Sequence, residues 1–237
     1  MSAIRSTFFY LGVLVATLIA VGVVPIAACL PRRPCYRLLS FWNVCVLWSA
    51  KVFCGITYEV RGRENIPESG PYMLMANHQS AFETVLLVVL LPQPAFVLKQ
   101  SLLWIPVIGW GLALTRPIVI DRSSPVRSLK RLLRQARERF ARGDVVVIFP
   151  EGTRVPVGEH RSYQAGGAHI ATQSQISVLP MAHNAGHFWP RGFLKKPGKV
   201  TVRIGPPIST EGLQPAQLNE QVRKWIETAG AQLSPPM

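Results

Sequence analysis

The first quarter of the chain is dominated by apolar positions. Residues 7–30 carry no charged side chain, and this run is long enough to span a bilayer with some tilt. Arg5 precedes the run, and Arg32, Arg33 and Arg37 follow it. Basic residues favour the cytoplasmic side of a membrane, so the downstream cluster predicts that the rest of the chain stays in the cytoplasm.

A second apolar stretch, residues 38–56, is interrupted by Asn43 and Lys51 and contains three aromatic residues. If it crossed the membrane, Arg32 and Arg33 would lie outside, against the charge rule. A helix that lies in the interface, or dips in and returns, fits better, and a core helix of the following domain fits about equally well. Residues 1–57 are therefore predicted to be a membrane anchor, with one spanning or re-entrant helix plus an interfacial helix.

Cys29 supports one competing interpretation. Residues 26–29 (Ile-Ala-Ala-Cys) resemble a lipoprotein cleavage box, which would export the rest of the chain. The apolar run is longer than a usual signal core and its basic cluster lies downstream, so export is the weaker alternative.

The other cysteines are Cys35, Cys45 and Cys54. Because no Cys-x-x-Cys pair occurs, all four are predicted to be small buried apolar side chains rather than ligands or disulfides.

After residue 57 the pattern changes to alternating short elements. Segments with helical spacing separate several apolar runs rich in Val and Ile. The runs are residues 72–76, 95–98, 118–120, 145–149, 178–182 and 200–204. This alternation predicts an α/β fold in which helices flank a mixed central sheet, and residues 58–237 are predicted to be a catalytic domain.

Two later segments have the apolar stripe of a surface helix. Residues 125–141 begin with a potential cap at Ser124 and end before Gly143. The predicted outer faces of this helix are basic, with Arg127, Lys130, Arg131, Arg134, Arg137, Arg139 and Arg142. These faces are either solvated or in contact with anionic lipid headgroups, at about 1 kcal/mol per basic residue. Residues 215–229 form the second such helix, which we interpret as structural.

The composition of the chain predicts an anionic partner. Among 237 residues, 49% are hydrophobic, and Lys and Arg outnumber Asp and Glu by 26 to 12, for a net charge of +14. A basic excess favours nucleic acid, an anionic membrane surface or a phosphorylated substrate. No nucleic-acid-binding motif is present, so membrane lipids are the predicted partner and nucleic acid is not.

Polar clusters follow three of the predicted strands. Asn77 and His78 follow the first, Asp121 and Arg122 follow the third, and residues 150–154 (Pro-Glu-Gly-Thr-Arg) follow the fourth. Because ligands bind where the carboxyl ends of strands face a crevice, these clusters are expected to converge on one site. Such a site would combine a potential base with arginines that suit a phosphate.

Glu83 is the acid nearest to His78. Five residues on a regular helix place two side chains about 140° apart, so the pair can interact only if His78 precedes the helix predicted over residues 84–91. His183 and His187 have a spacing that a metal could use, but no carboxylate is near them in sequence. We interpret these two as structural or site-wall residues, with no metal predicted.

Four blocks in order give the chain a specific resemblance. They are residues 77–80 (Asn-His-Gln-Ser) with Glu83, 120–122 (Ile-Asp-Arg), 149–154 (Phe-Pro-Glu-Gly-Thr-Arg) and 178–180 (Val-Leu-Pro). This set resembles the glycerolipid acyltransferases, most closely the bacterial 1-acylglycerol-3-phosphate (lysophosphatidic acid) acyltransferases. The likeness runs from about residue 58 to the Gly-Pro-Pro-Ile segment at residues 205–208.

The resemblance implies acyl transfer from a thioester to the sn-2 hydroxyl of lysophosphatidic acid, forming phosphatidic acid for phospholipid biosynthesis. It implies that His78 is the general base and that Glu83 orients it and stabilises the imidazolium. The positions that match the family's glycerol-phosphate site are Arg122, Glu151, Gly152, Thr153 and Arg154. No cofactor is implied beyond acyl-CoA or an acyl carrier protein as co-substrate.

Two departures from the family pattern affect this expectation. The family most often has aspartate where this chain has Glu83, and commonly lysine where Gln164 stands. The alternatives are acylation of another lysophospholipid or an aminolipid, and a non-catalytic anionic-lipid-binding protein. The expected location is the inner (cytoplasmic) membrane, with the catalytic domain facing the cytoplasm. Acyl chain preference, the thioester carrier and the oligomeric state are not determined by the sequence.

Overall fold

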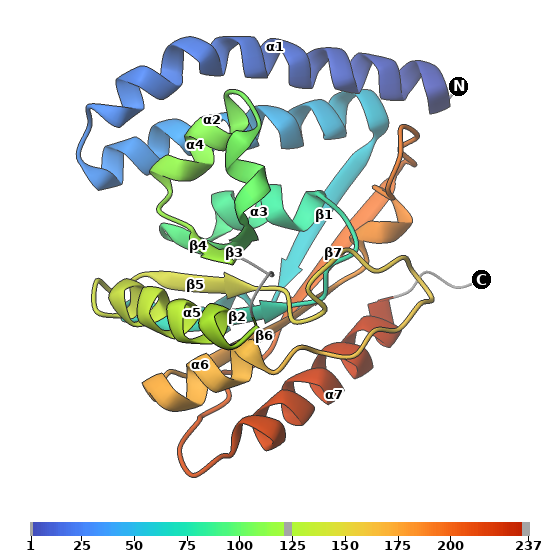
Figure 1. The fold of residues 1–237 in the computed structure, drawn as a ribbon. Coiled ribbons are helices and arrows are strands. Elements are labelled where there is room, and N and C mark those ends of the chain that lie inside the picture. The colour runs from blue at the N-terminus through green and yellow to red at the C-terminus, as the bar shows by residue number, and fades with distance from the viewer. Residues whose placement is uncertain (1, 121–124, 234–237) are drawn as a thin grey trace.

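A computed structural model describes residues 2–120 and 125–233, with side chains from residue 129 onward in the second range. Within these residues, seven strands form one sheet in the order β1-β7-β6-β2-β5-β3-β4 (Figure 1). The strands are β1 (Ile56–Arg61), β2 (Tyr72–Ala76), β3 (Pro94–Lys99), β4 (Ile118–Ile120), β5 (Val145–Ile148), β6 (Val178–His183) and β7 (Gly198–Ile204). The sheet is mixed, as predicted.

The sheet consists of two parallel blocks. Strands β6, β2, β5, β3 and β4 run parallel to one another, whereas β7 pairs antiparallel with β6 and parallel with β1. The carboxyl ends of the five parallel strands therefore share one edge of the sheet. In this block β2 lies between β5 and β6, so the residues after β2 lie beside the ends of both neighbours.

Helices cover both faces of the sheet (Figure 1). One face carries α1 (Ser2–Ala28), α2 (Arg32–Cys54), α3 (Phe82–Leu90) and α4 (Ile108–Leu114), and the other carries α5 (Pro125–Phe140), α6 (Gly166–Ser174) and α7 (Pro215–Leu233). Short 3₁₀ turns are η1 (Arg63–Asn65), η2 (Gln100–Trp104) and η3 (Ala185–His187). Alternate side chains of β2 enter the two cores, Leu74 on the α3 side and Met73 on the α7 side. Burial on both faces explains why β2 appears in the sequence as an unbroken apolar run.

Strand β1 was not predicted. It begins directly after Gly55, whose left-handed φ of 67° ends α2, and whose N–H bonds to the carbonyl oxygen of Lys51 at 3.1 Å. Because the apolar stretch of α2 continues into Ile56, the sequence shows no break there, and the charged Glu59 and Arg61 hide the strand that follows. The predicted division at residues 57–58 falls inside β1, and the two-domain organisation stays a prediction.

The N-terminal helix is apolar enough to cross a membrane. In the described part of the chain, α1 is the single helix with that length and composition. It packs along α2 (Figure 1), with Phe9 buried against Trp189, while Leu14 and Leu18 point outward. Helix α2 packs one side into the core and exposes apolar residues on the other, and its position at the membrane interface stays a prediction. Its buried residues include Val46, Leu47 and Ala50, and its exposed ones Phe41, Trp48 and Val52.

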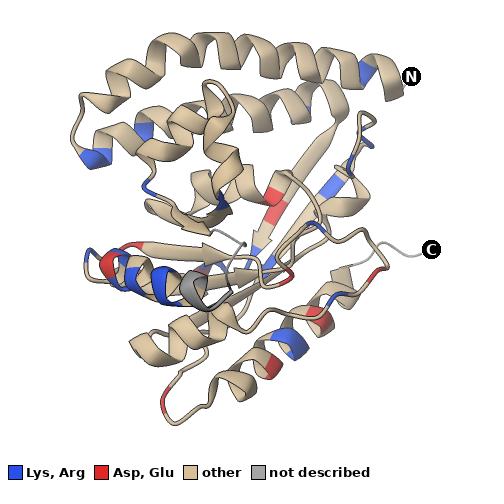
Figure 2. Ribbon diagram, in the orientation of Figure 1, with Lys and Arg blue, Asp and Glu red and all other residues tan. Residues whose placement is uncertain are grey.

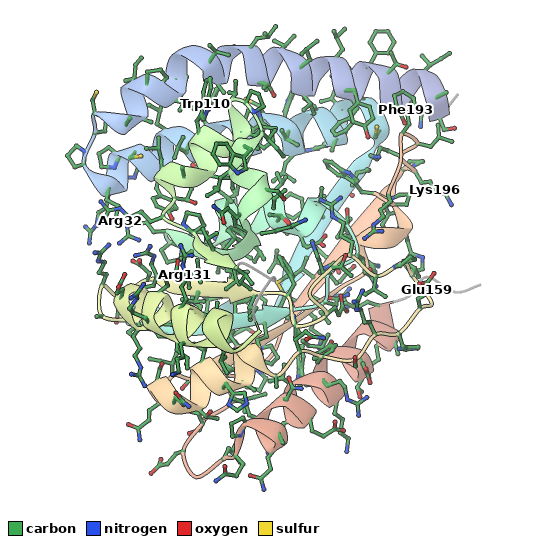
Figure 3. The ribbon with its side chains drawn as sticks, viewed as in Figure 1. Arg32, Trp110, Arg131, Glu159, Phe193 and Lys196 are labelled. Carbon is green, nitrogen blue, oxygen red and sulfur yellow. The ribbon has the colours of Figure 1, made fainter. Side chains whose placement is uncertain are left out.

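The basic helix α5 requires one correction. Its basic residues Lys130, Arg131, Arg134 and Arg137 are exposed as predicted. Figure 2 shows basic positions along this helix in blue, and Figure 3 labels Arg131. Arg139, which was assigned to the same solvated faces, is only 9% exposed, and its Nε donates to the carbonyl oxygen of Arg116 at 2.8 Å. It lies one position from the core residue Phe140, so its stem is covered while the guanidinium finds an oxygen. The proposed cap Ser124 lies outside the described residues.

The prediction that all cysteines are buried was right for two of them. Cys35 and Cys54 are buried, Cys45 is partly exposed, and Cys29 is exposed in the turn after α1. All four are free thiols. Cys29 escapes burial because the connection between α1 and α2 lies at the end of the helix pair, where nothing packs over it.

Candidate active site

His78 lies in the loop between β2 and α3. Its Nδ1 is 2.8 Å from Oε1 of Glu83. Helix α3 begins at Phe82, so His78 precedes the helix, which is the arrangement that the five-residue spacing required. The His78 ring stacks on Phe149, with ring centroids 4.2 Å apart and planes inclined by 14°. Phe149 therefore contacts the face of the His78 ring, and Glu83 holds the edge that carries Nδ1.

Glu83 is fully buried, and the loop before it supplies donors to one of its oxygens. Oε1 accepts the backbone N–H groups of Gln79 at 3.1 Å and Ser80 at 2.9 Å, in addition to His78. Burial by itself raises the pKa of the Glu83 carboxyl, but the imidazoles of His183 and His78 and the Ser80 N–H together hold it below its ordinary value. Glu83 is therefore an anion at neutral pH.

This carboxylate fixes the tautomer of His78. A carboxylate oxygen only accepts, so Nδ1 carries the proton and the unprotonated Nε2 points away from Glu83. His78 also lines a large cavity. An imidazole with an unprotonated Nε2 and an anion behind Nδ1 is arranged to take a proton from a bound group.

The loop after β5 holds the His78 backbone from both sides. Oε2 of Glu151 accepts the His78 N–H at 2.8 Å, and the N–H of Val155 donates to the His78 carbonyl oxygen at 2.7 Å. Between them Gly152 has a φ of +71°, a conformation that favours glycine, and its N–H donates to the Phe149 carbonyl oxygen at 2.9 Å. Residues of two different predicted clusters are thus joined directly.

Arg154 follows this turn and lines the same cavity. Its backbone oxygen accepts from Nη2 of Arg191 at 2.6 Å, and the same nitrogen lies 3.4 Å from Oγ1 of Thr153. In the part of the chain that the structure describes, no carboxylate pairs with the Arg154 guanidinium. It is a partly exposed cation at a site that already contains a base. Arg122, the other predicted phosphate contact, lies outside the described residues.

Burial raises the pKa of Glu151 to about 7, despite the hydrogen bond from the His78 N–H. Replacing Glu151 by glutamine is expected to remove a pH-dependent loss of stability. A carboxyl whose folded pKa lies above its ordinary 4.5 stabilises the fold fully below pH 4.5, and loses this contribution as the pH rises through 7. The shift corresponds to about 3 kcal/mol.

Thermal unfolding of the parent and E151Q in detergent, at several pH values, measures this effect. The difference in unfolding free energy should move by about 3 kcal/mol in favour of E151Q between pH 4.5 and 8. Comparing the two proteins at each pH cancels the opposite contributions of Glu83 and His183, whose pKa values are lowered. A difference that stays constant with pH would contradict the raised pKa.

The position of His183 beside Glu83 was not predicted from the sequence. His183 ends β6, the neighbour of β2, and is fully buried, with Nε2 3.8 Å from Oε2 of Glu83. No carboxylate is near His183 in sequence, but the fold brings Glu83 to it from another part of the chain. The signal that could have placed it was its position directly after an apolar run, like His78. Among the described residues no cluster of His, Cys, Asp and Glu has the arrangement of a metal site.

The cavity beside His78 has a volume of about 1020 Å³, at the upper end of the usual range for ligand pockets. It extends from His78 and Arg154 past β3 to the space between α1, α2 and α4. Its walls are mainly apolar, including Ala20, Val24, Trp42, Phe96, Gly111 and Leu112. A polar end that carries a base and a cation thus continues into a long apolar interior.

Comparisons with known proteins find relatives of this chain in sequence and in fold. The Acyltransferase family model matches residues 57–184. The chain is 43% identical to a 1-acyl-sn-glycerol-3-phosphate acyltransferase of Pseudomonas aeruginosa, over 98% of this chain and 93% of that protein. It is 30% identical to the human 1-acyl-sn-glycerol-3-phosphate acyltransferase alpha, over 80% of this chain and 69% of the relative. The crystal structure of PlsC, the 1-acyl-sn-glycerophosphate acyltransferase of Thermotoga maritima, has a similar fold, with a TM-score of 0.82 and 23% identity, and the match covers 100% of this chain and 97% of that one.

Proposed function

The chain belongs to the acyltransferase family, and on that premise we propose that it transfers an acyl chain from an acyl thioester to the sn-2 hydroxyl of 1-acylglycerol-3-phosphate. The product is phosphatidic acid, a precursor in phospholipid biosynthesis. The observation that carries the proposal is the His78–Glu83 pair at the mouth of an apolar cavity that also contains Arg154. The relatives' names support the choice of acceptor.

The reaction uses His78 as the general base. Nε2 takes the proton of the sn-2 hydroxyl while its oxygen attacks the thioester carbonyl, and Glu83 stabilises the imidazolium that forms. The new C–O bond forms as the C–S bond breaks, and the proton passes from His78 to the leaving thiolate. No covalent enzyme intermediate is needed. The steps use only side chains of the protein and the two substrates, so we propose no cofactor.

The acceptor's phosphate binds to the loop after β5. Arg154 supplies a planar guanidinium, and the turn at Gly152 and Thr153 brings backbone close to the ligand. Arg122 belongs to the proposed phosphate contacts, although it lies outside the described residues. Glu151 completes the set by joining this loop to the His78 peptide, so that phosphate binding and the base are positioned together.

The apolar cavity holds an acyl chain next to the base. This assignment predicts a change in chain-length preference in Gly111→Phe. A Cβ at Gly111 meets only Leu39 and Val24 at 3.8 Å among the described residues, so a larger side chain there projects into the cavity without a backbone clash.

We expect turnover of Gly111→Phe with long acyl donors to fall at least about 10-fold relative to short ones, since several methylenes lose their space. Rates with C8, C12 and C16 donors measure this ratio, and Gly111→Ala is the matched control. A ratio equal to that of the parent would show that the acyl chain does not bind in this cavity.

The protein associates with membranes through its N-terminal helices. Because α1 lies along α2 rather than standing alone, we propose that both lie in the cytoplasmic leaflet of the inner membrane, with the catalytic domain in the cytoplasm. Exposed apolar side chains of α1, α2 and α4 form the contact surface, including Leu14, Leu18, Trp48 and Trp110, the last of which is labelled on α4 in Figure 3. The thioester arrives from the cytoplasm, on coenzyme A or an acyl carrier protein.

The proposed activity is tested with the purified full chain in detergent or vesicles. The protein is incubated with lysophosphatidic acid and a labelled acyl-CoA or acyl carrier protein, and the product is identified by mass. Phosphatidic acid is the expected product. Faster acylation of lysophosphatidylcholine or of an aminolipid would instead assign another acceptor, and the absence of acyl transfer to every acceptor would refute the proposed reaction.

A further inference from the structure

His183 and Asn77 are joined by three hydrogen bonds across β2 and β6. The Asn77 side chain donates through Nδ2 to the His183 carbonyl oxygen at 2.9 Å and accepts the His183 N–H at 3.0 Å through Oδ1. The His183 ring returns a bond through Nε2, which lies 2.8 Å from the carbonyl oxygen of Asn77. Asn77 immediately precedes His78. The base therefore starts from a strand end that is bound to β6 by side chains as well as by the sheet.

These contacts fix the protonation of His183. A carbonyl oxygen only accepts, so Nε2 carries the proton, and Nδ1 accepts the Ala185 N–H at 3.2 Å. A second proton on Nδ1 would point at that N–H and break the bond. His183 is therefore a neutral imidazole. Burial also lowers its pKa, which favours the same neutral form.

Nε2 of His183, whose proton is bound to the Asn77 carbonyl oxygen, also lies near the second oxygen of Glu83. Oε1 accepts three N–H groups, whereas the buried Oε2 has no hydrogen bond within the described residues and lies 3.8 Å from Nε2 of His183. A buried carboxylate oxygen without a donor is costly, so a nearby N–H dipole lowers the energy of the anion. Glu83 thus lies between two imidazoles, and only His78 is free to accept a proton.

We propose that His183 is a positioning residue for acyl transfer, which holds Asn77 through its Nε2–H and places the positive end of that N–H dipole near Oε2 of Glu83, so that Glu83 remains an anion aligned with His78. The inference rests on the proposed function. His183 has no exposed surface at its side chain and lies behind Glu83, away from the cavity. Its loss should therefore lower kcat and leave KM for both substrates within about 2-fold, because substrate binding is untouched.

Two replacements of His183 distinguish the contribution of Nε2 from that of Nδ1. His183→Gln places an amide N–H near the position of Nε2, whereas His183→Asn places its side-chain atoms near Nδ1 and leaves no donor for Asn77 or Glu83. We expect H183N to lower kcat about 10-fold, the factor that corresponds to a change of one unit in the pKa of the Glu83 carboxyl, and H183Q to recover most of it. His187→Asn is the matched control, since the structure gives this side chain no contact with His78 or Glu83. Equal turnover of H183N and the parent would overturn the proposal, as would equal losses in H183N and H183Q.

A pH profile distinguishes this role from a purely structural one. Without the N–H dipole the Glu83 anion is less stable, so the acidic limb of kcat should move to higher pH by roughly one unit in H183N. Glu151 also titrates near this group, but every variant compared retains it. A variant that is merely less folded would have a lower melting temperature and fewer active molecules, with an unshifted limb.

A double-mutant cycle tests the route through Glu83. In an E83Q background, H183N should cost less than about 2-fold, because the anion that it supports is absent. An unchanged cost in that background would contradict the inference. If H78A and E83Q themselves retain full activity, the proposed mechanism fails first. If they lose activity while H183N does not, only the role of His183 fails.

A measurement on the unmutated protein completes the test and does not depend on whether variants fold. Histidine labelled with ¹⁵N should report His183 as the neutral Nε2–H tautomer from pH 5 to 8. A charged His183 at pH 6, or an Nδ1–H tautomer, would overturn the assignment.

Discussion

Replacing His78 by alanine is expected to lower kcat for acylation of lysophosphatidic acid by about 10²–10⁴-fold, the usual contribution of a positioned general base. The sn-2 hydroxyl then keeps its proton while it attacks the thioester, and the Glu83 anion has no imidazolium to stabilise. Binding should change little, because the apolar cavity and Arg154 remain in place. Initial rates with labelled acyl-CoA, at saturating and limiting acceptor, separate kcat from KM.

The control for this experiment is His187→Ala, because His187 lies in η3 beside Phe188 and outside the site. Both variants should partition into vesicles like the parent, since α1 and α2 are untouched. Turnover by H78A within 2-fold of the parent would remove the proposed base from the mechanism. A loss in both variants would indicate damage to the fold at the end of β6 rather than loss of the base.

Replacing Arg154 by alanine is expected to lower kcat/KM for lysophosphatidic acid roughly 100-fold or more, because hydrogen bonds between a charged side chain and a ligand contribute about 1.5–3 kcal/mol each. The loss should be specific to the phosphate. With 1-monoacylglycerol, which has the hydroxyl but no phosphate, the parent and R154A should react at similar low rates. The ratio of kcat/KM for the two acceptors measures the discrimination directly.

Lysine at this position tests the geometry of the contact. Arg154→Lys keeps the positive charge but not the planar fork, so it should recover only part of the preference for lysophosphatidic acid. Arg203→Ala, on the exposed side of β7, is the control for removal of an arginine elsewhere. An unchanged acceptor ratio in R154A would mean that Arg154 does not bind the phosphate.

The central part of the site was predictable from short stretches of sequence. Runs such as residues 72–76 and 145–149 indicated buried strands because both faces of these strands are covered by helices. The five-residue spacing of His78 and Glu83 required a turn before the helix, and the structure has that turn. The end of the second run was placed one residue late, since β5 stops at Ile148 and Phe149 stacks on His78.

Elsewhere the sequence pattern was insufficient because a side chain's environment came from a distant element. Arg139 was placed on the solvated side of its helix, but an oxygen at Arg116 and the neighbouring core draw it inward. His183 was weighed only against His187, the histidine that is close to it in sequence. The contact with Glu83 depends on the pairing of β6 with β2, which joins residues about a hundred positions apart.

The amino-acid sequence by itself determined the length and apolar character of α1, the order of the blocks and the short spacing that lets His78 and Glu83 meet. Each of these follows from the length of an apolar run or from spacing over a few residues, where backbone geometry leaves few choices. Only the tertiary structure decided that β6 lies beside β2, which brings a second imidazole to Glu83, and that α1 and α2 close a cavity over the sheet. Strand order and helix docking depend on the burial of apolar surface between elements far apart in the chain, so no local stretch specifies them.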